Sequence, residues 1–230
     1  MNKFVFTCGD TNGIGPEIIF KTLNKIAGKN TDIYFLVIPK NVFELTSRKI
    51  KPNFPYKFIL EAAAAASGVN IIFLEKASIK LGAATKASGK ASYLSIKKSF
   101  DLLDNGFADA VITAPISKTA INLAGINFPG HTEMFAEWCG AKNYLMTFLS
   151  KKMNAALVTI HEPLKKVPEL ITKEKLRSVF DTVEIMLKSD LKILNPKIAL
   201  LGLNPHAGEA GLIGTEEKII IEPLLKEKNI

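Results

Sequence analysis

Three histidines, His131, His161 and His206, each lie in a short polar run that follows an apolar run. The apolar runs have the length and composition of strands, so the histidines are expected just past strand ends. In open α/β sheets, ligands bind in the crevice beyond the carboxyl ends of the strands. Imidazole is a common metal ligand and the usual acid or base near neutral pH. The pattern therefore favours a catalytic cleft over three unrelated loop histidines.

His161 and His206 are both flanked by proline, and each is predicted to follow an apolar strand. Two imidazoles at strand ends are the start of a divalent-metal site, which needs at least one further ligand. Glu209 is a candidate for that ligand or for a residue supporting one. Glu216 and Glu217 are interpreted as the beginning of the last helix.

His131 and Thr132 lie between Pro129-Gly130 and a helix predicted over residues 133–138. Backbone amides at the start of a helix favour anions. These two residues are therefore predicted to bind a phosphate or carboxylate group.

A glycine-rich run, Gly9 to Glu17, joins the first predicted strand to a helix that begins at Pro16. It could be a structural turn beside the cleft, which would place Asp10 there, or a loop that cradles phosphate. Its spacing matches neither a dinucleotide fingerprint nor a P-loop, and the second strand ends in Pro39-Lys40 without an acidic residue for ribose. A standard dinucleotide site is not expected at this turn.

Another strand is followed by Thr113-Ala114-Pro115-Ile116-Ser117-Lys118. Thr113 and Lys118 could face the same crevice, or Lys118 could lie on a solvated helix surface. The sequence leaves both interpretations open.

The formal charge is +8, yet only Arg48 and Arg177 among the 30 basic residues are arginine. Nucleic-acid readout depends on arginine, so the lysines indicate a solvated surface that could steer an anionic substrate. No run approaches the roughly 20 apolar residues of a membrane span. Cys8 and Cys139 lie far apart without metal-type spacing, which is typical of reduced thiols in a cytoplasmic protein.

Strands that alternate with helices predict an α/β fold with a largely parallel sheet. Two strand candidates with no helix between them, 144–149 and 155–160, indicate a local antiparallel pair and a second lobe. One helix is predicted from about Ser88, with an apolar stripe at Tyr93, Ile96, Phe100, Leu103 and Phe107, and a second over 173–194 behind Thr172. The remaining predicted strands are 3–7, 32–38, 71–74, 109–113 and 197–201.

These motifs together resemble the 4-hydroxythreonine-4-phosphate dehydrogenases of pyridoxal 5'-phosphate biosynthesis, the PdxA type. The resemblance covers Gly9 to about Glu217, with small departures at Thr11 and Asn12. The matching runs are Gly-Asp-x-x-Gly-Ile-Gly-Pro-Glu, Thr-Ala-Pro-Ile-x-Lys, Gly-His-Thr-Glu, His-x-Pro-Leu and Leu-Asn-Pro-His-Ala-Gly-Glu.

The resemblance implies the two-lobed isocitrate and isopropylmalate dehydrogenase fold, with the active site in the cleft between lobes at a homodimer interface. Residues 1–115, joined by 200–230, would form the first lobe, and residues 116–199 the central lobe. His161 and His206 would bind Zn, Mg or Co, and His131 and Thr132 the phosphorylated substrate. Family members continue beyond the equivalent of Ile230 with a third metal histidine and much of the NAD site, so the chain is expected to be truncated or degenerate.

The activity implied is NAD- or NADP-dependent oxidation of 4-phosphooxy-L-threonine at C3, followed by decarboxylation to 3-amino-2-oxopropyl phosphate. The sequence does not identify the general base. Three alternatives remain open: a dehydrogenase of erythronate or threonate 4-phosphate, a phosphate acyltransferase of the same fold, and an inactive fragment.

Overall fold

The computed structural model describes residues 1–29 and 31–228, and the chain divides into two compact units, residues 1–135 and 136–230. This division does not test the prediction that residues 200–230 join the first lobe, which stays a prediction. No helix in the described ranges is long and apolar enough to cross a membrane.

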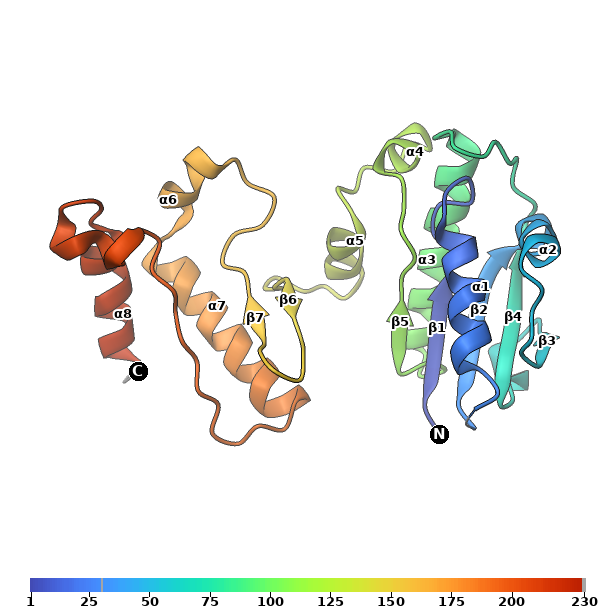
Figure 1. Cartoon of the computed structure of the whole chain (residues 1–230), viewed down its shortest axis with the longest axis horizontal. Helices are drawn as coiled ribbons and strands as arrows, with labels where there is room; N and C mark the ends of the chain where they lie inside the picture. The colour runs from blue at the N-terminus through green and yellow to red at the C-terminus, as the bar shows by residue number, and fades with distance from the viewer. Residues whose placement is uncertain (30, 229–230) are drawn as a thin grey trace. The chain divides into compact units, whose positions relative to one another are not determined.

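A five-stranded sheet forms the centre of the first unit, and every neighbouring pair of strands is parallel (Figure 1). This confirms the predicted α/β class. The strand order is β3-β4-β2-β1-β5. The bounds are β1 (Lys3–Thr7), β2 (Ile33–Pro39), β3 (Tyr56–Phe58), β4 (Gly68–Leu74) and β5 (Ala110–Ile112).

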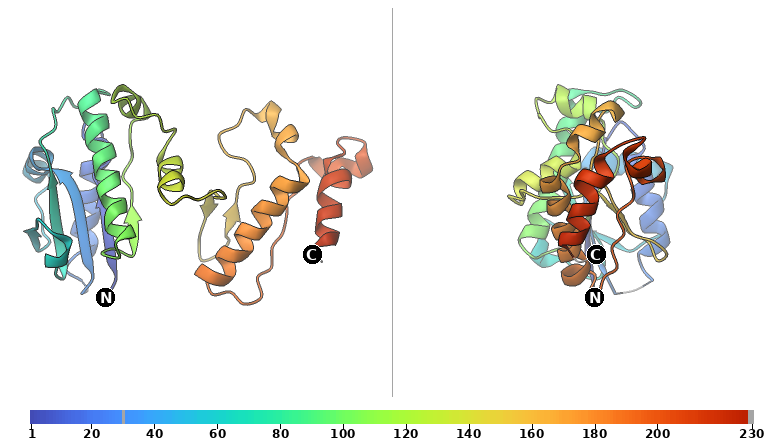
Figure 2. Two further views of the ribbon diagram at one scale, coloured as in Figure 1. Left: turned by 180° about the vertical axis from the view of Figure 1, so that it is seen from behind. Right: turned by 90° about the vertical axis from the view of Figure 1, so that its left-hand side faces the viewer.

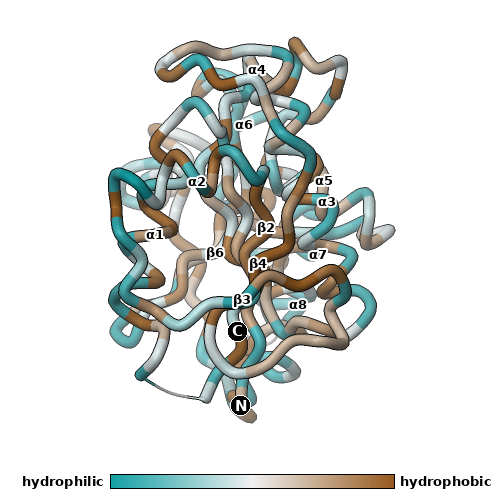
Figure 3. Tube along the Cα trace, turned by 90° about the vertical axis from the view of Figure 1, so that its right-hand side faces the viewer, coloured by the Kyte–Doolittle hydropathy of each residue, from teal (hydrophilic) through white to brown (hydrophobic). Residues whose placement is uncertain are grey.

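Helices cover both faces of this sheet, as parallel strands require. Helices α1 (Gly15–Ile26) and α2 (Lys40–Lys49) pack on one face, and α3 (Lys86–Asp104) crosses the other (Figure 2). Successive residues of β2 alternate between the two cores, and every residue of the strand is buried. Figure 3 shows the resulting hydrophobic runs along β2 and β4.

Buried serines on α3 bind the strand ends, and the sequence pattern did not predict this. The Ser92 hydroxyl donates to the Gly9 carbonyl oxygen at 2.8 Å. Ser95 donates to the Val37 carbonyl oxygen at 2.7 Å and accepts from the Cys8 amide at 3.0 Å. In the predicted stripe, Ile96 and Phe100 are buried.

Two details of the α3 prediction were wrong. The N-cap is Thr85, and Ser88 is its partner three residues later in a capping box. Phe107 is 37% exposed beyond the end of the helix, because the chain turns at Gly106 with φ +72° before reaching it.

Two short helices follow β5: α4 (Lys118–Leu123), capped by the Ser117 side chain, and α5 (His131–Trp138), which begins in the first unit and continues past its boundary at Phe135. The α4 backbone packs closely on α3, because a Cβ on Gly89 would lie 1.8 Å from the Ala120 carbonyl oxygen. Phe135 of α5 packs near Phe100 of α3, with ring centroids 6.2 Å apart.

The second unit contains the predicted antiparallel pair, shortened to β6 (Thr147–Phe148) and β7 (Ala155–Ala156). Its core lies between α7 and the terminal helices, with Leu176, Phe180, Ile221 and Leu224 buried together. Thr172 caps α7 as expected. The other elements are 3-10 turns (Leu164–Lys166, Pro205–Gly211), α6 (Val167–Leu170), α7 (Lys173–Ile185), π turns (Met186–Asp190, Glu217–Ile221) and α8 (Glu222–Glu227).

The strand predicted over 197–201 was wrong, because this segment is irregular. Ile198 and Leu200 pack against the core of the second unit, which explains their alternating pattern. Among the described residues, however, the segment joins no strand ladder. The predicted helix over 173–194 also ends early, since its π turn stops at Asp190.

We expect Ser95→Ala to destabilise the protein by roughly 1–3 kcal/mol, because the buried Cys8 amide then loses its hydrogen-bond partner. Ser99→Ala is the matched control, since its hydroxyl donates to the Ser95 carbonyl of its own helix. Alanine favours the helix, so the control should lose less. Urea unfolding of both variants measures the difference, and equal losses would contradict the role given to Ser95.

Candidate functional site

The loops after β1 and β5 touch at their backbones. The Asp10 amide donates to the Pro115 carbonyl oxygen at 2.8 Å, and a Cβ on Gly9 would lie 2.4 Å from that same oxygen. Gly9 also has φ +65°, a conformation that favours glycine. The Asp10 carboxylate accepts from the Asn12 amide at 3.1 Å. This hydrogen bonding favours the structural-turn interpretation of the glycine-rich run.

Asn12 fastens this turn to the segment that leads into α3. Its side-chain amide donates to the Ala83 carbonyl oxygen at 2.8 Å and to Thr85 Oγ1 at 3.2 Å. Its side-chain oxygen accepts from the Lys80 amide at 2.9 Å. The departure from the family pattern at Asn12 therefore has a structural role.

Lys118 approaches the start of α5. A Cβ on Gly130 would lie 3.9 Å from Lys118 Cε and 3.4 Å from Glu133 Oε2. Gly130 therefore lies close to both a lysine side chain and a carboxylate, and His131 follows it as the first residue of α5.

The environment of His131 is unusual for a histidine. Its Nε2 is buried without a hydrogen-bond partner in the described structure. Burial lowers the pKa of His131 below 6.5, and the Glu133 carboxylate opposes that shift. His131 is therefore neutral at pH 7, and a ligand that hydrogen bonds to Nε2 would satisfy this atom. Thr132 lies half-buried beside it.

His161 and His206 are exposed residues of the second unit, and both have left-handed backbone conformations, with φ +57° and +50°. Neither directly follows a strand, since β7 ends at Ala156 and residues 197–201 are irregular. His131 follows the short helix α4. The expectation that the histidines lie just past strand ends was therefore wrong.

Residues 206–210 all have positive φ, and four of these five are not glycine. The left-handed conformation costs roughly 1–2 kcal/mol for each non-glycine residue. Such a run persists only where surrounding contacts hold it.

Those contacts come from Asn204 and two glutamates. Glu217 accepts from the Asn204 backbone amide at 2.6 Å and from its side-chain amide at 2.9 Å. Glu216 accepts from the same side-chain amide at 2.8 Å. Hydrogen bonds from Asn204 lower the pKa of the buried Glu217, so the carboxylate is ionised at neutral pH.

His161 and His206 fit a divalent metal by donor type, since imidazole suits Zn and Co. They do not make a complete site, because no group of three or more His, Cys, Asp or Glu side chains in the described ranges could hold a metal. Glu209 is exposed and belongs to no such group. The two histidines would supply part of a ligand set.

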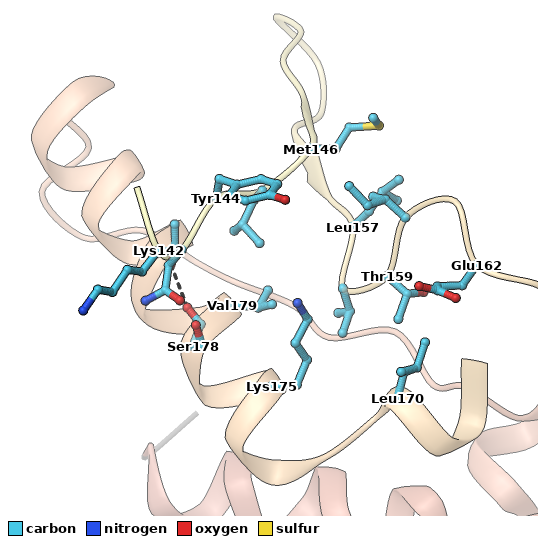
Figure 4. A pocket seen from close by; sticks show the side chains of 15 residues that line it. Lys142, Tyr144, Met146, Leu157, Thr159, Glu162, Leu170, Lys175, Ser178 and Val179 are labelled. Atoms are coloured by element: carbon cyan, nitrogen blue, oxygen red, sulfur yellow. Dashed lines mark hydrogen bonds between the residues drawn. The ribbon is translucent and has the colours of Figure 1, made fainter. Parts of the chain in front are cut away.

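A cavity of about 370 Å³ lies beside His161, and Ile160 and Glu162 line it (Figure 4). Figure 4 shows the Lys175 side chain rising from α7 toward the space near Tyr144 and Thr159. Apolar side chains line much of the rest. The cavity therefore offers an ammonium group and hydroxyls to a small anionic molecule.

The predicted site residues fall into two sets. The first unit holds Asp10, Thr113, Lys118, His131 and Thr132, and the second holds His161, His206 and Glu209. Sequence reasoning missed the roles of Asn204 and Glu217. Both lie in or near a quoted motif, but their spacing of 13 residues matches no local pattern.

We expect stability to fall as the pH drops below about 6.5, the value for histidine in the unfolded chain, toward the lower pKa of folded His131. In that interval the unfolded chain binds a proton at this residue and the folded chain does not. His131→Gln should remove this part of the pH dependence. NMR titration of the imidazole measures the pKa directly, and a value above 6.5 would contradict the burial argument.

Comparisons with known proteins agree with the quoted motifs. Residues 24–229 match the family model described as pyridoxal phosphate biosynthetic protein PdxA. The chain is 40% identical over 228 residues to a 4-hydroxythreonine-4-phosphate dehydrogenase of Sulfurihydrogenibium sp., covering 98% of this chain and 70% of that protein. It is 31% identical over 227 residues to a D-threonate 4-phosphate dehydrogenase of Salmonella typhimurium, covering 96% and 69%.

A solved structure gives the same answer for the fold. The crystal structure of 4-hydroxythreonine-4-phosphate dehydrogenase from Klebsiella pneumoniae superimposes with a TM-score of 0.87 at 28% identity, covering 99% of this chain and 70% of that one. With the resemblance found in the sequence confirmed by the family model and by these relatives, the chain belongs to the PdxA family of dehydrogenases.

Proposed function

We propose that this protein oxidises 4-phosphooxy-L-threonine at the C3 hydroxyl and that the product loses its C1 carboxylate as CO2. Overall, a hydride leaves C3 for NAD or NADP and the hydroxyl proton is released. Loss of CO2 leaves an electron pair at C2, which takes up one proton, so that 3-amino-2-oxopropyl phosphate remains and no net proton is released. The observation that carries this proposal is the 40% identity to a dehydrogenase named for this substrate.

The start of α5 is the proposed phosphate site. The neutral His131 presents a buried Nε2 without a partner, and Thr132 and the helix amides lie beside it. Lys118 approaches the same point past Gly130 and would supply positive charge. A carboxylate oxygen of Glu133 also lies near Gly130, which limits where an anion can sit.

We further propose that His161 and His206 supply two ligands to a divalent cation such as Zn, Mg or Co. When bound, such a cation acts as a Lewis acid toward an alcohol or ketone oxygen. The role of this chain is to present the two imidazoles. In the described residues no further donor completes the set.

The requirement for NAD or NADP rests on family membership alone. The turn after β1 is held by its own hydrogen bonds, and its glycine spacing is not that of a dinucleotide-binding loop. No residue of this chain is therefore assigned to the nicotinamide cofactor.

A phosphorylated sugar acid is the alternative substrate, because relatives with 31% identity are named D-threonate 4-phosphate dehydrogenases. Both substrates carry a phosphate, a C3 hydroxyl and a C1 carboxylate, and they differ in the amino or hydroxyl group at C2. The proposed phosphate site would accept either one.

We also propose a cytoplasmic homodimer with a shared active site. Phe148 at the end of β6 and Met153 in the turn after it are exposed apolar side chains, at 57% and 73%. Large exposed apolar patches are typical of surfaces covered by another subunit, and these two side chains would belong to such a surface.

We expect chelator-sensitive NADH formation from NAD and 4-phosphooxy-L-threonine in the presence of Zn, Mg or Co. His206→Ala should lower metal-dependent turnover by more than about 100-fold, since even residues that support a ligand contribute about 10 to 100-fold. Circular dichroism should show an unchanged fold. Full turnover by a metal-loaded His206→Ala protein would refute the metal role.

D-threonate 4-phosphate is the matched substrate in the same assay. Faster turnover of D-threonate 4-phosphate would show that the sugar acid phosphate, and not 4-phosphooxy-L-threonine, is the preferred substrate. Turnover of neither compound would count against the proposed activity of this chain.

A further inference from the structure

We infer that Glu217 is a positioning residue that presents His206 to the metal, an inference that rests on the proposed function. Glu217 is 4% exposed, although it carries a charge. Its two carboxylate oxygens bind different groups of Asn204, the backbone amide at 2.6 Å and the side-chain amide at 2.9 Å. Asn204 is two residues before His206, so the start of the left-handed run is fixed at this point.

The second attachment is through Gly208, two residues after His206. A Cβ on Gly208 would lie 2.9 Å from Glu217 Oε2 and 2.5 Å from the Gly214 carbonyl oxygen. Glu217 therefore lies against the chain on both sides of His206.

Glu216 makes the arrangement more rigid. Its carboxylate and that of Glu217 each bind Nδ2 of Asn204, at 2.8 and 2.9 Å, so both amide hydrogens have acceptors. A Cβ on Gly214 would lie 2.2 Å from that nitrogen, so the chain closes directly over it. The side chain of Asn204 consequently has one orientation. This fixes the direction in which the backbone continues toward His206.

A carboxylate at position 217 is needed because both groups that face it are donors. In Glu217→Gln, one oxygen is replaced by an amide nitrogen that would face an N–H of Asn204. One of the two hydrogen bonds from Asn204 is then lost, although the side chain at position 217 keeps its size. The loop can relax, and His206 loses its fixed position.

The test is isothermal titration of the protein with Co2+, which needs no turnover. We expect Glu217→Gln to weaken Co2+ binding by about 10 to 100-fold, the range for residues that orient a metal ligand. Glu222→Gln on α8 is the matched control, since it makes the same change at an exposed glutamate, and it should bind like the original protein.

A double-mutant cycle separates positioning through His206 from a general loss of stability. If Glu217 acts through His206, Glu217→Gln should cost nothing further in a His206→Ala background. Additive losses would overturn the inference, as would unchanged binding in Glu217→Gln. If Glu217→Gln does not fold, Asn204→Ala replaces it in the cycle, because it removes the amide that both carboxylates bind.

The same titration distinguishes failure of the inference from failure of the proposed function. If His206→Ala binds Co2+ as well as the original protein, the metal site itself is wrong. If His206→Ala binds weakly while Glu217→Gln binds normally, the metal site stands and the role of Glu217 falls.

Discussion

The close approach of the chain at Gly9 to the carbonyl oxygen of Pro115 is the contact on which the first unit depends. A side chain at Gly9 would overlap that oxygen, and the Asp10 amide donates to it. The loops that leave β1 and β5 are thereby held together at the carboxyl ends of these two parallel strands. Ser92 fixes the other side of Gly9 from α3, so the loop has little freedom. The segment that leads from Pro115 to Lys118 therefore starts from a fixed position.

The second unit is built on a different principle. Its two strands are each two residues long, and the segment before His206 joins no strand ladder among the described residues. Backbone pairing therefore cannot set the direction of His206. Hydrogen bonds to side-chain carboxylates set this direction in place of strand pairing. The buried Glu217 accepts two of them from Asn204. An ionised group in this position makes the loop dependent on charge, whereas the turn at Gly9 depends on backbone hydrogen bonds.

The sheet was predictable because its strands are continuous apolar runs, as in β2, where every residue is buried. The same reasoning failed for residues 197–201, whose alternating pattern reflects packing of Ile198 and Leu200 against helices. It also missed β3, which is three residues long with exposed side chains. The buried serines of α3 could not be predicted from an apolar pattern, because serine is polar. Their burial depends on hydrogen bonds to carbonyl groups that are distant in sequence.

Several residues in the motifs that identify the family are required by the backbone. Gly9 and Gly208 allow contacts that no side chain would permit, and Asn204 closes a loop through its hydrogen bond to Glu217. Such residues are needed whichever substrate is bound, so the motifs reveal the family and remain uninformative about the substrate. The choice between an amino and a hydroxyl group at C2 requires a polar side chain at that atom, and such a side chain need not alter the backbone. The chain is 40% identical to a relative named for one substrate and 31% identical to a relative named for the other, so overall similarity alone does not separate the two.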